Sequence, residues 1–436
     1  MVLLSNVPLP EQSLSLEHDA FIDVLASTKN LLIIQDLDGV CMRLMKDPIS
    51  RVIDLTYVEA TKAFDGQFFV LTNGEHIGKR GVNGIIERAV GDPFGVKQNG
   101  LYLPGLAAGG VQWQDRQGAV FHPGVSDQEL GFLERIPNKI EDRLRCFFER
   151  RPSLLESVEL ENCIQSAVLS NKASPTVNLN TFYQRLGDRT DIYIALQREM
   201  QTLMEDILFE AGQSGLGESF FVHYAPNWGQ DERGKEIVWF TQGQESGTTD
   251  FQFMLRGAVK EAGVLAILNH YVFQKTGDYP LGEEFNVRQA PNNQADLLNL
   301  VADAFKAEHL PIMVGVGDTV TSKVAEMAEG QVQVRRGGSD RNFLQLIQDI
   351  GKLFNNGNLV VYVDSSDGEL KNRQPLKVGK ALPADSESLP TKLKVLEGPG
   401  DPLDTDDPLR LNVAFPGGYR QYTAIFKEAA RKRLGG

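Results

Sequence analysis

Two aspartates end an apolar run near the start of the chain, where residues 31–40 read LLIIQDLDGV. Asp36 and Asp38 are two positions apart, so in extended backbone their carboxylates point to the same side. Carboxylates this close repel each other unless a cation lies between them or one of them holds a proton. A hard divalent ion such as Mg²⁺ would resolve the conflict, because it prefers oxygen ligands and keeps some waters for a phosphate. The alternative is that the pair only caps a turn, where aspartate is common.

Two further apolar runs end in residues that suit the same chemistry. GQFFVLTNGE contains Thr72, Asn73 and Gly74, and LPIMVGVGDT contains Asp318. Ligands of open α/β sheets bind beyond the carboxyl ends of the strands, so we expect these residues to meet the two aspartates there. A hydroxyl, the N–H groups of a loop that opens a helix, and a third carboxylate together suit phosphoryl transfer. Taken alone, Thr72 and Asp318 could each cap a helix, in the second case a helix over residues 319–330.

The elements that must position these residues are those of an α/β fold. All three apolar runs pass directly into polar or glycine residues, which is typical of parallel strands buried on both faces. Between the first two runs, Ile53, Tyr57, Ala60 and Phe64 recur at the spacing of one helix face. The predicted order is strand, helix, strand, and we expect a Rossmann-like parallel sheet.

The spacing of the motifs predicts an inserted domain. From Thr72 to Asp318 there are 246 positions, far more than a core sheet needs. Strand-like stretches such as ESFFVHYAP and EIVWFTQG, and the helical stretch DIYIALQREMQTLMEDILFEAG, lie within this interval. We therefore expect a core formed by residues 1–117 and 291–436, with an α+β domain inserted at residues 118–290.

The C-terminal part of the chain predicts more core elements and one irregular arm. A helix is expected in RRGGSDRNFLQLIQDIGKLF, a strand in GNLVVYVDSSDGE, and a final amphipathic helix in YRQYTAIFKEAARKRL. Residues 380–409 are rich in proline, glycine and acids, and are expected to form a loop or mobile arm.

Composition narrows the classes of partner and compartment. The formal net charge of -14 argues against nucleic acid as a partner, because that binding depends on Lys and Arg neutralising phosphates. The three cysteines form no CxxC pair, which favours a reducing cytoplasm. No signal peptide and no apolar stretch long enough to span a membrane is present, so no membrane association is expected.

The three strand ends, taken in order, carry a family resemblance. The patterns hhhhDxDG, hhhTNG and hhhGxGD resemble motifs one, two and four of the haloacid dehalogenase superfamily of phosphatases. This resemblance implies that Asp36 attacks phosphorus to form an aspartyl-phosphate and that Asp38 is the general acid and base. It implies that Thr72 and the amide of Asn73 hold the phosphoryl oxygens. It also implies Mg²⁺ as cofactor, bound by Asp36, by Asp38 through its carbonyl, and by Asp318.

Longer stretches resemble a narrower family. The segment FGVKQNGLYLPG is similar to one that follows motif two in members whose cap domain, which usually chooses the substrate, is inserted late. Five other stretches together resemble the glucosylglycerol 3-phosphate phosphatases of cyanobacteria. They are DLDGVCMRLMKDPISRVID, LTNGEHIGKRGVNG, VGVGDTVTSKVAE, VRRGGSDRNFLQLIQDIG and DPLRLNVAFPGGYRQY. Membership implies hydrolysis of 2-O-glucosylglycerol phosphate to a compatible solute used in salt tolerance, downstream of a glycosyltransferase-type synthase.

Two departures from the superfamily pattern leave alternatives open. The motif-three lysine is expected near residues 292–294, which are Asn, Asn and Gln, so either another cation neutralises the phosphate or the register of this motif is wrong. The candidates are Lys79, Arg80, Lys275 and Arg288. A second acid is expected near Asp318, where Thr319 and Ser322 stand instead. The alternatives are a phosphatase for sucrose or trehalose phosphate, and a catalytically weak regulatory partner of the synthase.

Overall fold

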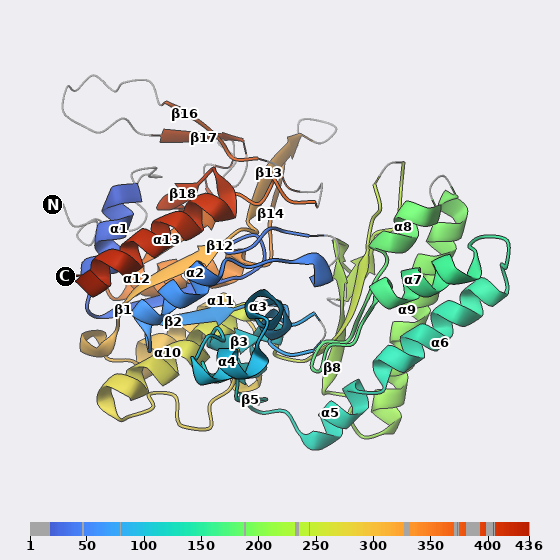
Figure 1. Cartoon of the computed structure of the whole chain (residues 1–436), viewed down its shortest axis with the longest axis horizontal. Coiled ribbons are helices and arrows are strands. Elements are labelled where there is room, and N and C mark those ends of the chain that lie inside the picture. The colour runs from blue at the N-terminus through green and yellow to red at the C-terminus, as the bar shows by residue number, and fades with distance from the viewer. Residues whose placement is uncertain are drawn as a thin grey trace. The chain divides into compact units, whose positions relative to one another are not determined.

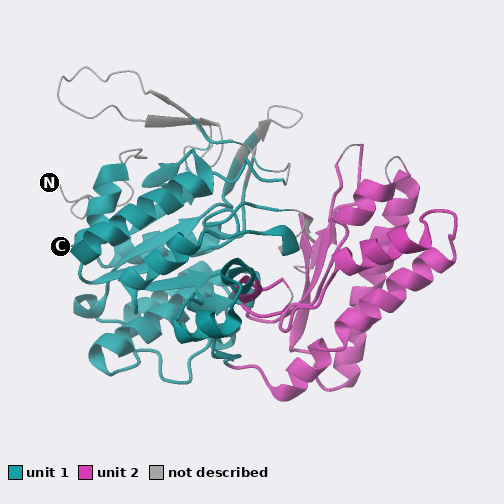
Figure 2. Cartoon of the chain, in the orientation of Figure 1, with its two compact units in different colours: residues 1–74, 85–123, 259–436 teal, residues 75–84, 124–258 magenta. Residues whose placement is uncertain are grey.

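The computed structural model describes most of the 436-residue chain. The described residues are 18–45, 48–78, 80–186, 189–231, 235–243, 245–326, 332–369, 373, 375–380, 393–397, 404 and 406–435. Two compact units divide it, coloured separately in Figure 2. Unit 1 comprises residues 1–74, 85–123 and 259–436, and unit 2 comprises residues 75–84 and 124–258.

Unit 1 is built on an eight-stranded sheet of the order β18-β15-β12-β1-β2-β3-β4-β5. Its strands are β1 (Leu31–Gln35), β2 (Phe68–Leu71), β3 (Gly105–Ala107), β4 (Gln112–Gln114), β5 (Val120–Phe121), β12 (Ile312–Gly317), β15 (Leu359–Val363) and β18 (Val413–Phe415). The strands from β18 to β3 pair in parallel, and only β4 and β5 pair antiparallel. The expected α/β class with a parallel-dominated sheet is confirmed. All five residues of β1 are buried, as expected of a central strand covered on both faces.

Two groups of helices cover this sheet, one on each face (Figure 1). The first group is α1 (His18–Ser27), α2 (Leu55–Ala60) and α13 (Gly418–Gly435), with α13 packed on β15 and β18. The second group is α10 (Lys260–Thr276), α11 (Gln294–Ala304) and α12 (Arg341–Leu353), with α10 on β2 and β3 and α12 on β12 and β15. The short helices α3 (Val82–Val90) and α4 (Pro93–Gln98) lie between β2 and β3 in the chain. The predicted strand, helix, strand order holds, although the helix is α2 followed by a 3₁₀ turn, η4 (Thr61–Phe64).

Unit 2 is an antiparallel sheet with helices packed on it. Its strand order is β6-β7-β11-β8, formed by β6 (Val168–Leu169), β7 (Thr176–Asn178), β11 (Asp250–Leu255) and β8 (Phe220–Ala225). The helices are α5 (Asp127–Leu133), α6 (Ile136–Glu149), α7 (Ser157–Ala167), α8 (Asn180–Leu186) and α9 (Thr190–Gln213), and a small pair of strands adds β9 (Asn227–Gln230) and β10 (Glu236–Val238). Helix α9 packs on β8 and β11, and α6 and α7 pack on β6.

The division differs from the expected insertion of residues 118–290 mainly at its end. Unit 1 resumes at Val259, so α10 belongs to the sheet of unit 1. The physical reason is close packing on β2, because a Cβ at Gly263 of α10 would lie 2.5 Å from Leu71 Cδ1. The long apolar helix α10 therefore serves as a core helix and not as part of an inserted domain.

The expectation of a helix over residues 319–330 is wrong for residues 319–326, the part of this stretch that the structure describes. Thr321–Glu326 form strand β13, which pairs antiparallel with β14 (Val332–Gly337). The β-branched residues Thr321 and Val324 favour this extended form. Of the expected arm at residues 380–409, strand β17 (Leu393–Glu397) pairs with β16 (Lys377–Lys380), and most of the remainder lies outside the described residues.

Within the described part of the chain, no helix combines the length and the hydropathy needed to cross a membrane.

Candidate active site

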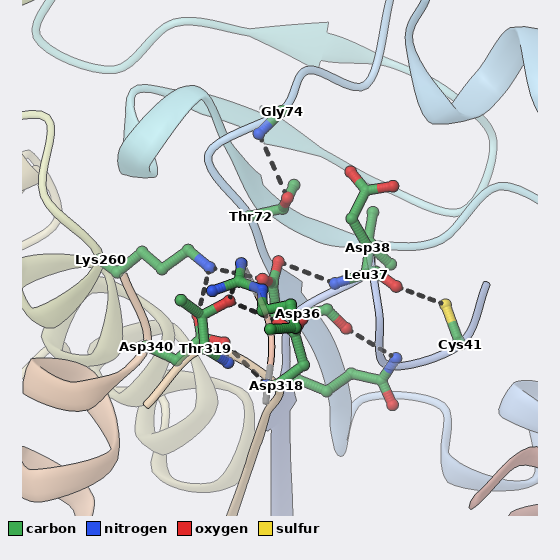
Figure 3. A network of polar contacts seen from close by, with 12 residues as sticks. Asp36, Leu37, Asp38, Cys41, Thr72, Gly74, Lys260, Asp318, Thr319 and Asp340 are labelled. Carbon is green, nitrogen blue, oxygen red and sulfur yellow. Dashed lines mark hydrogen bonds and ion pairs between the residues drawn. The ribbon is translucent and has the colours of Figure 1, made fainter. Parts of the chain in front are cut away.

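The carboxylate of Asp36 is held from two sides where the chain leaves β1. The backbone N–H of Leu37 donates to Oδ1 at 2.8 Å, and Lys260 Nζ lies 2.8 Å from Oδ2. Lys260 is the first residue of α10, and its side chain is only 2% exposed. A buried ammonium at this distance neutralises part of the charge at the end of the strand (Figure 3).

Asp340 is the second partner of Lys260, and it links α12 to the end of β12. Lys260 Nζ donates to Asp340 Oδ1 at 2.7 Å. Although Asp340 occupies the N-cap position of α12, its side chain makes no cap to that helix. Its Oδ2 instead accepts the backbone N–H groups of Asp318 at 2.9 Å and Thr319 at 3.0 Å. The start of α12 is thereby fixed against the turn that carries Asp318.

Three carboxylates gather around this point. Asp36, Asp318 and Asp340 each offer one oxygen, and these oxygens lie within 4.8 Å of one another. Asp318 Oδ2 is buried and has no hydrogen-bond partner among the described residues. A Cβ at Gly39 would lie 2.2 Å from that oxygen, so the glycine of the DxDG motif leaves room beside it. An orphaned buried oxygen within a set of three carboxylates fits a hard divalent cation such as Mg²⁺.

Burial and mutual repulsion set the ionisation of these acids. Burial raises the pKa of Asp36 to about 8 despite Lys260, and Asp340 and Asp318 add to the effect. Burial, with the charge of Asp340, also raises the pKa of Asp318 to about 7. Burial opposes the ionisation of Asp340 too, but Lys260 and the two N–H donors hold the pKa of Asp340 below its ordinary value. The site therefore holds protons near neutral pH that a bound cation must displace.

Asp38 lies outside this carboxylate group, with a cation of its own. Arg51 Nη1 lies 2.8 Å from Asp38 Oδ1 and 2.6 Å from Oδ2. The predicted conflict between the two neighbouring aspartates is thus resolved by two cations, Lys260 for Asp36 and Arg51 for Asp38. That Asp38 binds a metal through its carbonyl stays a prediction.

The loop after β2 brings Thr72 and Gly74 next to Asp38. Thr72 Oγ1 accepts the backbone N–H of Gly74 at 3.2 Å, and a Cβ at Gly74 would lie 3.9 Å from Asp38 Oδ2. Asn73, between them, is exposed. The loop does not open a helix directly, since the next helix, α3, begins only at Val82. The N–H of Gly74 is therefore engaged within the loop, and the roles of Thr72, Asn73 and Gly74 in binding phosphate stay predictions.

Thr319 connects Asp318 to a further cation. Its hydroxyl donates to Asp318 Oδ1 at 2.8 Å and accepts from Arg373 Nη2, also at 2.8 Å. Thr319, which stands where a second acid was expected, thus orients Asp318, and Asp340, the residue before α12, brings another acid to this place.

Lys260 and Asp340 are the two residues that the sequence motifs missed. Of the four cations named as substitutes for the motif-three lysine, Lys79 lies outside the described residues. Arg80 donates to backbone carbonyls within unit 2, Lys275 lies over the Tyr271 ring, and Arg288 belongs to the short helix η6 (Val287–Gln289). The available signals were an isolated lysine before the apolar run of α10, and an aspartate after GGS before α12.

The comparisons with known proteins agree on one family. A profile for glucosylglycerol-phosphate phosphatase matches residues 30–430. The chain is 57% identical over 425 residues to the glucosylglycerol-phosphate phosphatase of Synechocystis sp. (strain ATCC 27184 / PCC 6803 / Kazusa), covering 98% of both chains.

Among solved structures, the similarities are remote. The C-terminal domain of C. albicans trehalose-6-phosphate phosphatase has a TM-score of 0.42 and 11% identity, covering 96% of this chain and 98% of that one. Aspergillus fumigatus trehalose-6-phosphate phosphatase has a TM-score of 0.38 and 8% identity, covering 96% and 99%. Scores this low carry no argument, whereas the profile match and the 57% identity show that the chain belongs to the glucosylglycerol-phosphate phosphatase family.

Proposed function

We propose that this protein is a Mg²⁺-dependent phosphomonoesterase that converts 2-O-(glucosyl)glycerol 3-phosphate to glucosylglycerol and phosphate. The observation that carries the chemistry is the buried carboxylate of Asp36, held between Lys260 and the acids Asp318 and Asp340 at the end of β1. The family to which the chain belongs supports the choice of substrate.

In the proposed reaction Asp36 is the nucleophile, and Asp38 is the general acid and base. A carboxylate oxygen of Asp36 attacks phosphorus, the bond to the ester oxygen breaks, and that oxygen takes a proton from Asp38 as the alcohol leaves. Asp38, now a carboxylate, accepts a proton from water as the water oxygen attacks phosphorus. The bond from phosphorus to Asp36 then breaks and releases phosphate.

The other residues of the site prepare it for an anion. Asp36, Asp318 and Asp340, together with the carbonyl of Asp38, would hold Mg²⁺, which when bound supplies positive charge to the phosphoryl oxygens and keeps Asp36 ionised. Lys260 contributes a fixed ammonium beside Asp36. We assign Thr72 and the amide of Asn73, on the loop beside Asp38, to the phosphoryl oxygens.

The setting follows from the same proposal. We place the reaction in the cytoplasm, after a synthase that supplies the sugar-glycerol phosphate, as a step in compatible-solute formation. We also assign the choice of sugar to unit 2. The rival proposal of a catalytically weak partner of the synthase depended on a missing lysine and a missing acid. We assign those two roles to Lys260 and Asp340, which lie beside Asp36, and this assignment removes the ground for the rival proposal.

Phosphate release by the purified protein tests the proposal. With Mg²⁺ present, the substrates to compare are glucosylglycerol phosphate, sucrose phosphate, trehalose phosphate and glycerol 3-phosphate. We expect a strong preference for glucosylglycerol phosphate that is lost in EDTA. Preference for another sugar phosphate would support the chemistry but replace the substrate. No phosphate release from any of these esters would instead favour a catalytically weak regulatory partner of the synthase.

The nucleophile is tested by Asp36→Asn. The amide has nearly the shape of the carboxylate but does not form the acyl phosphate, so we expect turnover to fall by at least about 1,000-fold while the fold survives. Circular dichroism and Mg²⁺-dependent phosphate release check the two halves of the prediction. Turnover close to that of the unmodified enzyme in a folded variant would overturn the mechanism.

A further inference from the structure

The two aspartates of the DxDG motif are held by different cations. Lys260 lies among the carboxylates around Asp36, whereas Arg51 contacts Asp38 outside that group. Lys260 contacts Asp36, whereas Arg51 contacts both carboxylate oxygens of Asp38 through a single nitrogen, Nη1. The Arg51 side chain is 10% exposed and that of Asp38 is 27% exposed. A shielded ion pair of this kind restricts the orientation of the carboxylate more than an exposed pair does.

The backbone around Arg51 is tied to the turn that carries Asp38. Met42 forms β-bridges both to Asp38 and to Ile53, and its carbonyl accepts the N–H of Gly39 at 2.9 Å. Asp54, three residues after Arg51, caps α2 by accepting the N–H of Thr56 at 2.9 Å. Arg51 therefore extends from backbone that is fixed both to the Asp38 turn and to the start of a helix.

The position in which Arg51 holds Asp38 faces the loop after β2. A Cβ at Gly74 would lie 3.9 Å from Asp38 Oδ2 and 3.6 Å from Thr72 Oγ1. The carboxylate that must exchange a proton with the leaving alcohol is thus presented to the loop assigned to the phosphoryl group. Proton transfer needs the acid within hydrogen-bond reach of its target, so in the proposed reaction the orientation of Asp38 affects the rate of this step.

We propose that Arg51 is a positioning residue, which holds the Asp38 carboxyl group in place. Asp38 gives its proton to the leaving alcohol in its protonated form and accepts a proton from the attacking water in its ionised form. This inference rests on the proposed function. It differs from a role in binding the phosphoryl group, because a positioning residue affects only those steps in which Asp38 moves a proton.

The test compares two esters that need the acid to different extents. The alkoxide that leaves from glucosylglycerol phosphate must be protonated, whereas nitrophenolate leaves from p-nitrophenyl phosphate without a proton. For Arg51→Met we expect kcat/KM to fall about 10- to 100-fold for the sugar ester, part of the roughly 100- to 10,000-fold that a positioned acid contributes. For nitrophenyl phosphate we expect a change of less than about 3-fold, because kcat/KM reports only the steps up to departure of the leaving group.

Two further measurements distinguish a role of Arg51 in positioning Asp38 from a role in binding phosphate. The inhibition constant of inorganic phosphate should be unchanged in Arg51→Met, and Arg51→Lys, which retains the charge, should recover part of the loss with the sugar ester. Equal losses with both esters, a matching rise in the inhibition constant, or no loss with either ester would each overturn the proposal. If Arg51→Met fails to fold, the same comparison of esters in Arg51→Lys decides it.

Arg116→Met is the matched control. Arg116 pairs with Asp65 in unit 1, and its side chain is 10% exposed, as that of Arg51 is. We expect this variant to melt at a lower temperature but to retain the ratio of kcat/KM between the two esters.

The unmodified enzyme tests the proposed function separately. If it hydrolyses nitrophenyl phosphate and glycerol 3-phosphate but not the sugar ester, only the proposed substrate is replaced. Glycerol 3-phosphate then serves as the alkyl ester in the comparison. If it hydrolyses no ester, the proposed function fails, and the role of Arg51 fails with it.

Discussion

Around Asp36 lie three buried carboxylates and one buried ammonium, which contacts two of them. Lys260 lies within 2.8 Å of both Asp36 and Asp340, while Asp318 Oδ2 has no hydrogen-bond partner among the described residues. Removing several charges from water costs free energy that the neighbouring cations do not fully recover. The raised pKa values of Asp36 and Asp318 express that cost, since each acid retains its proton more readily than it would in water. A divalent cation at this place would neutralise the excess charge.

Asp340 is the residue whose removal tests the carboxylate group most directly. Asp340→Asn removes one of the proposed anionic ligands but retains an oxygen that accepts the N–H groups of Asp318 and Thr319. We expect the Mg²⁺ concentration that gives half-maximal activity to rise by about 10-fold or more, with a smaller change at saturating Mg²⁺. A Mg²⁺ titration of phosphate release measures this shift.

Asp407→Asn provides the control for Asp340→Asn. Asp407 is a buried acid paired with Arg341, the first residue of α12, so its loss perturbs the same helix without touching the carboxylate group. Its Mg²⁺ requirement should match that of the unmodified enzyme, although its melting temperature should fall. An unchanged Mg²⁺ requirement in Asp340→Asn would show that Asp340 is not a ligand.

At the residue scale, the sequence predicted those parts of the site that directly follow strands. Asp36, Thr72 and Asp318 each come after an apolar run, and the α/β rule places them at the same edge of the sheet. Lys260 and Asp340 reach that edge from helices, and nothing in the local pattern says which helix end lies beside which strand end. Their roles depend on tertiary packing, which one sequence does not reveal.

At the element scale, the C-terminal helix α13 contacts both central strands of the sheet and the elements between them, and its Tyr422 hydroxyl donates to Gln35 Oε1 of β1 at 2.8 Å. Phe426 of α13 is fully buried and packs on Tyr57, Phe64 and Phe68. Phe426→Ala should destabilise the folded chain by about 3–5 kcal/mol, because it removes a large side chain and leaves a cavity. Denaturant melting checks the loss. Leu434→Ala in the same helix, where the side chain is 76% exposed, should change stability by less than about 0.5 kcal/mol.

The hairpin of β13 and β14 explains why the second acid lies so far from Asp318 in the sequence. The hairpin occupies the chain between β12 and α12. It separates Asp318 from Asp340 in the sequence, although the backbone N–H of Asp318 donates to Asp340 Oδ2 at 2.9 Å. The sequence suggests a helix here that Asp318 could cap, and a separate helix in RRGGSDRNFLQLIQDIGKLF. Thr321–Glu326 form a strand instead, whereas the second helix is confirmed as α12, which begins after Asp340.

For the whole molecule, the net charge of -14 opposes the approach of an anionic ester. Local cations must therefore create an attractive field at the site. Lys260, Arg51 and Arg373 all contact residues of the proposed active site in unit 1. Because Lys260 and Arg51 are largely shielded from solvent, salt should weaken their local effect less than it weakens the repulsion from exposed acids.

The dependence of stability on pH tests the proposed metal site at the scale of the whole molecule. The ordinary pKa of aspartate is 3.8, whereas the metal-free folded chain holds Asp36 at about 8 and Asp318 at about 7. Between these values the folded state binds more protons than the unfolded state. The contribution of these two acids to the free energy of unfolding therefore falls as pH rises through that range.

Mg²⁺ should reverse this trend, because it binds the ionised carboxylates and must displace their protons. We expect the rise in melting temperature caused by Mg²⁺ to be small near about pH 5.5 and clearly larger near about pH 8.5. Comparing samples with Mg²⁺ and with EDTA at each pH removes the contribution of groups remote from the site, such as His270, whose pKa is lowered by burial. In Asp318→Asn, which lacks one of the two titrating acids, the dependence on pH should be weaker. An equal rise in melting temperature at both pH values in the unmodified enzyme would mean that Mg²⁺ binds without displacing protons from Asp36 and Asp318, and would move the metal site away from them.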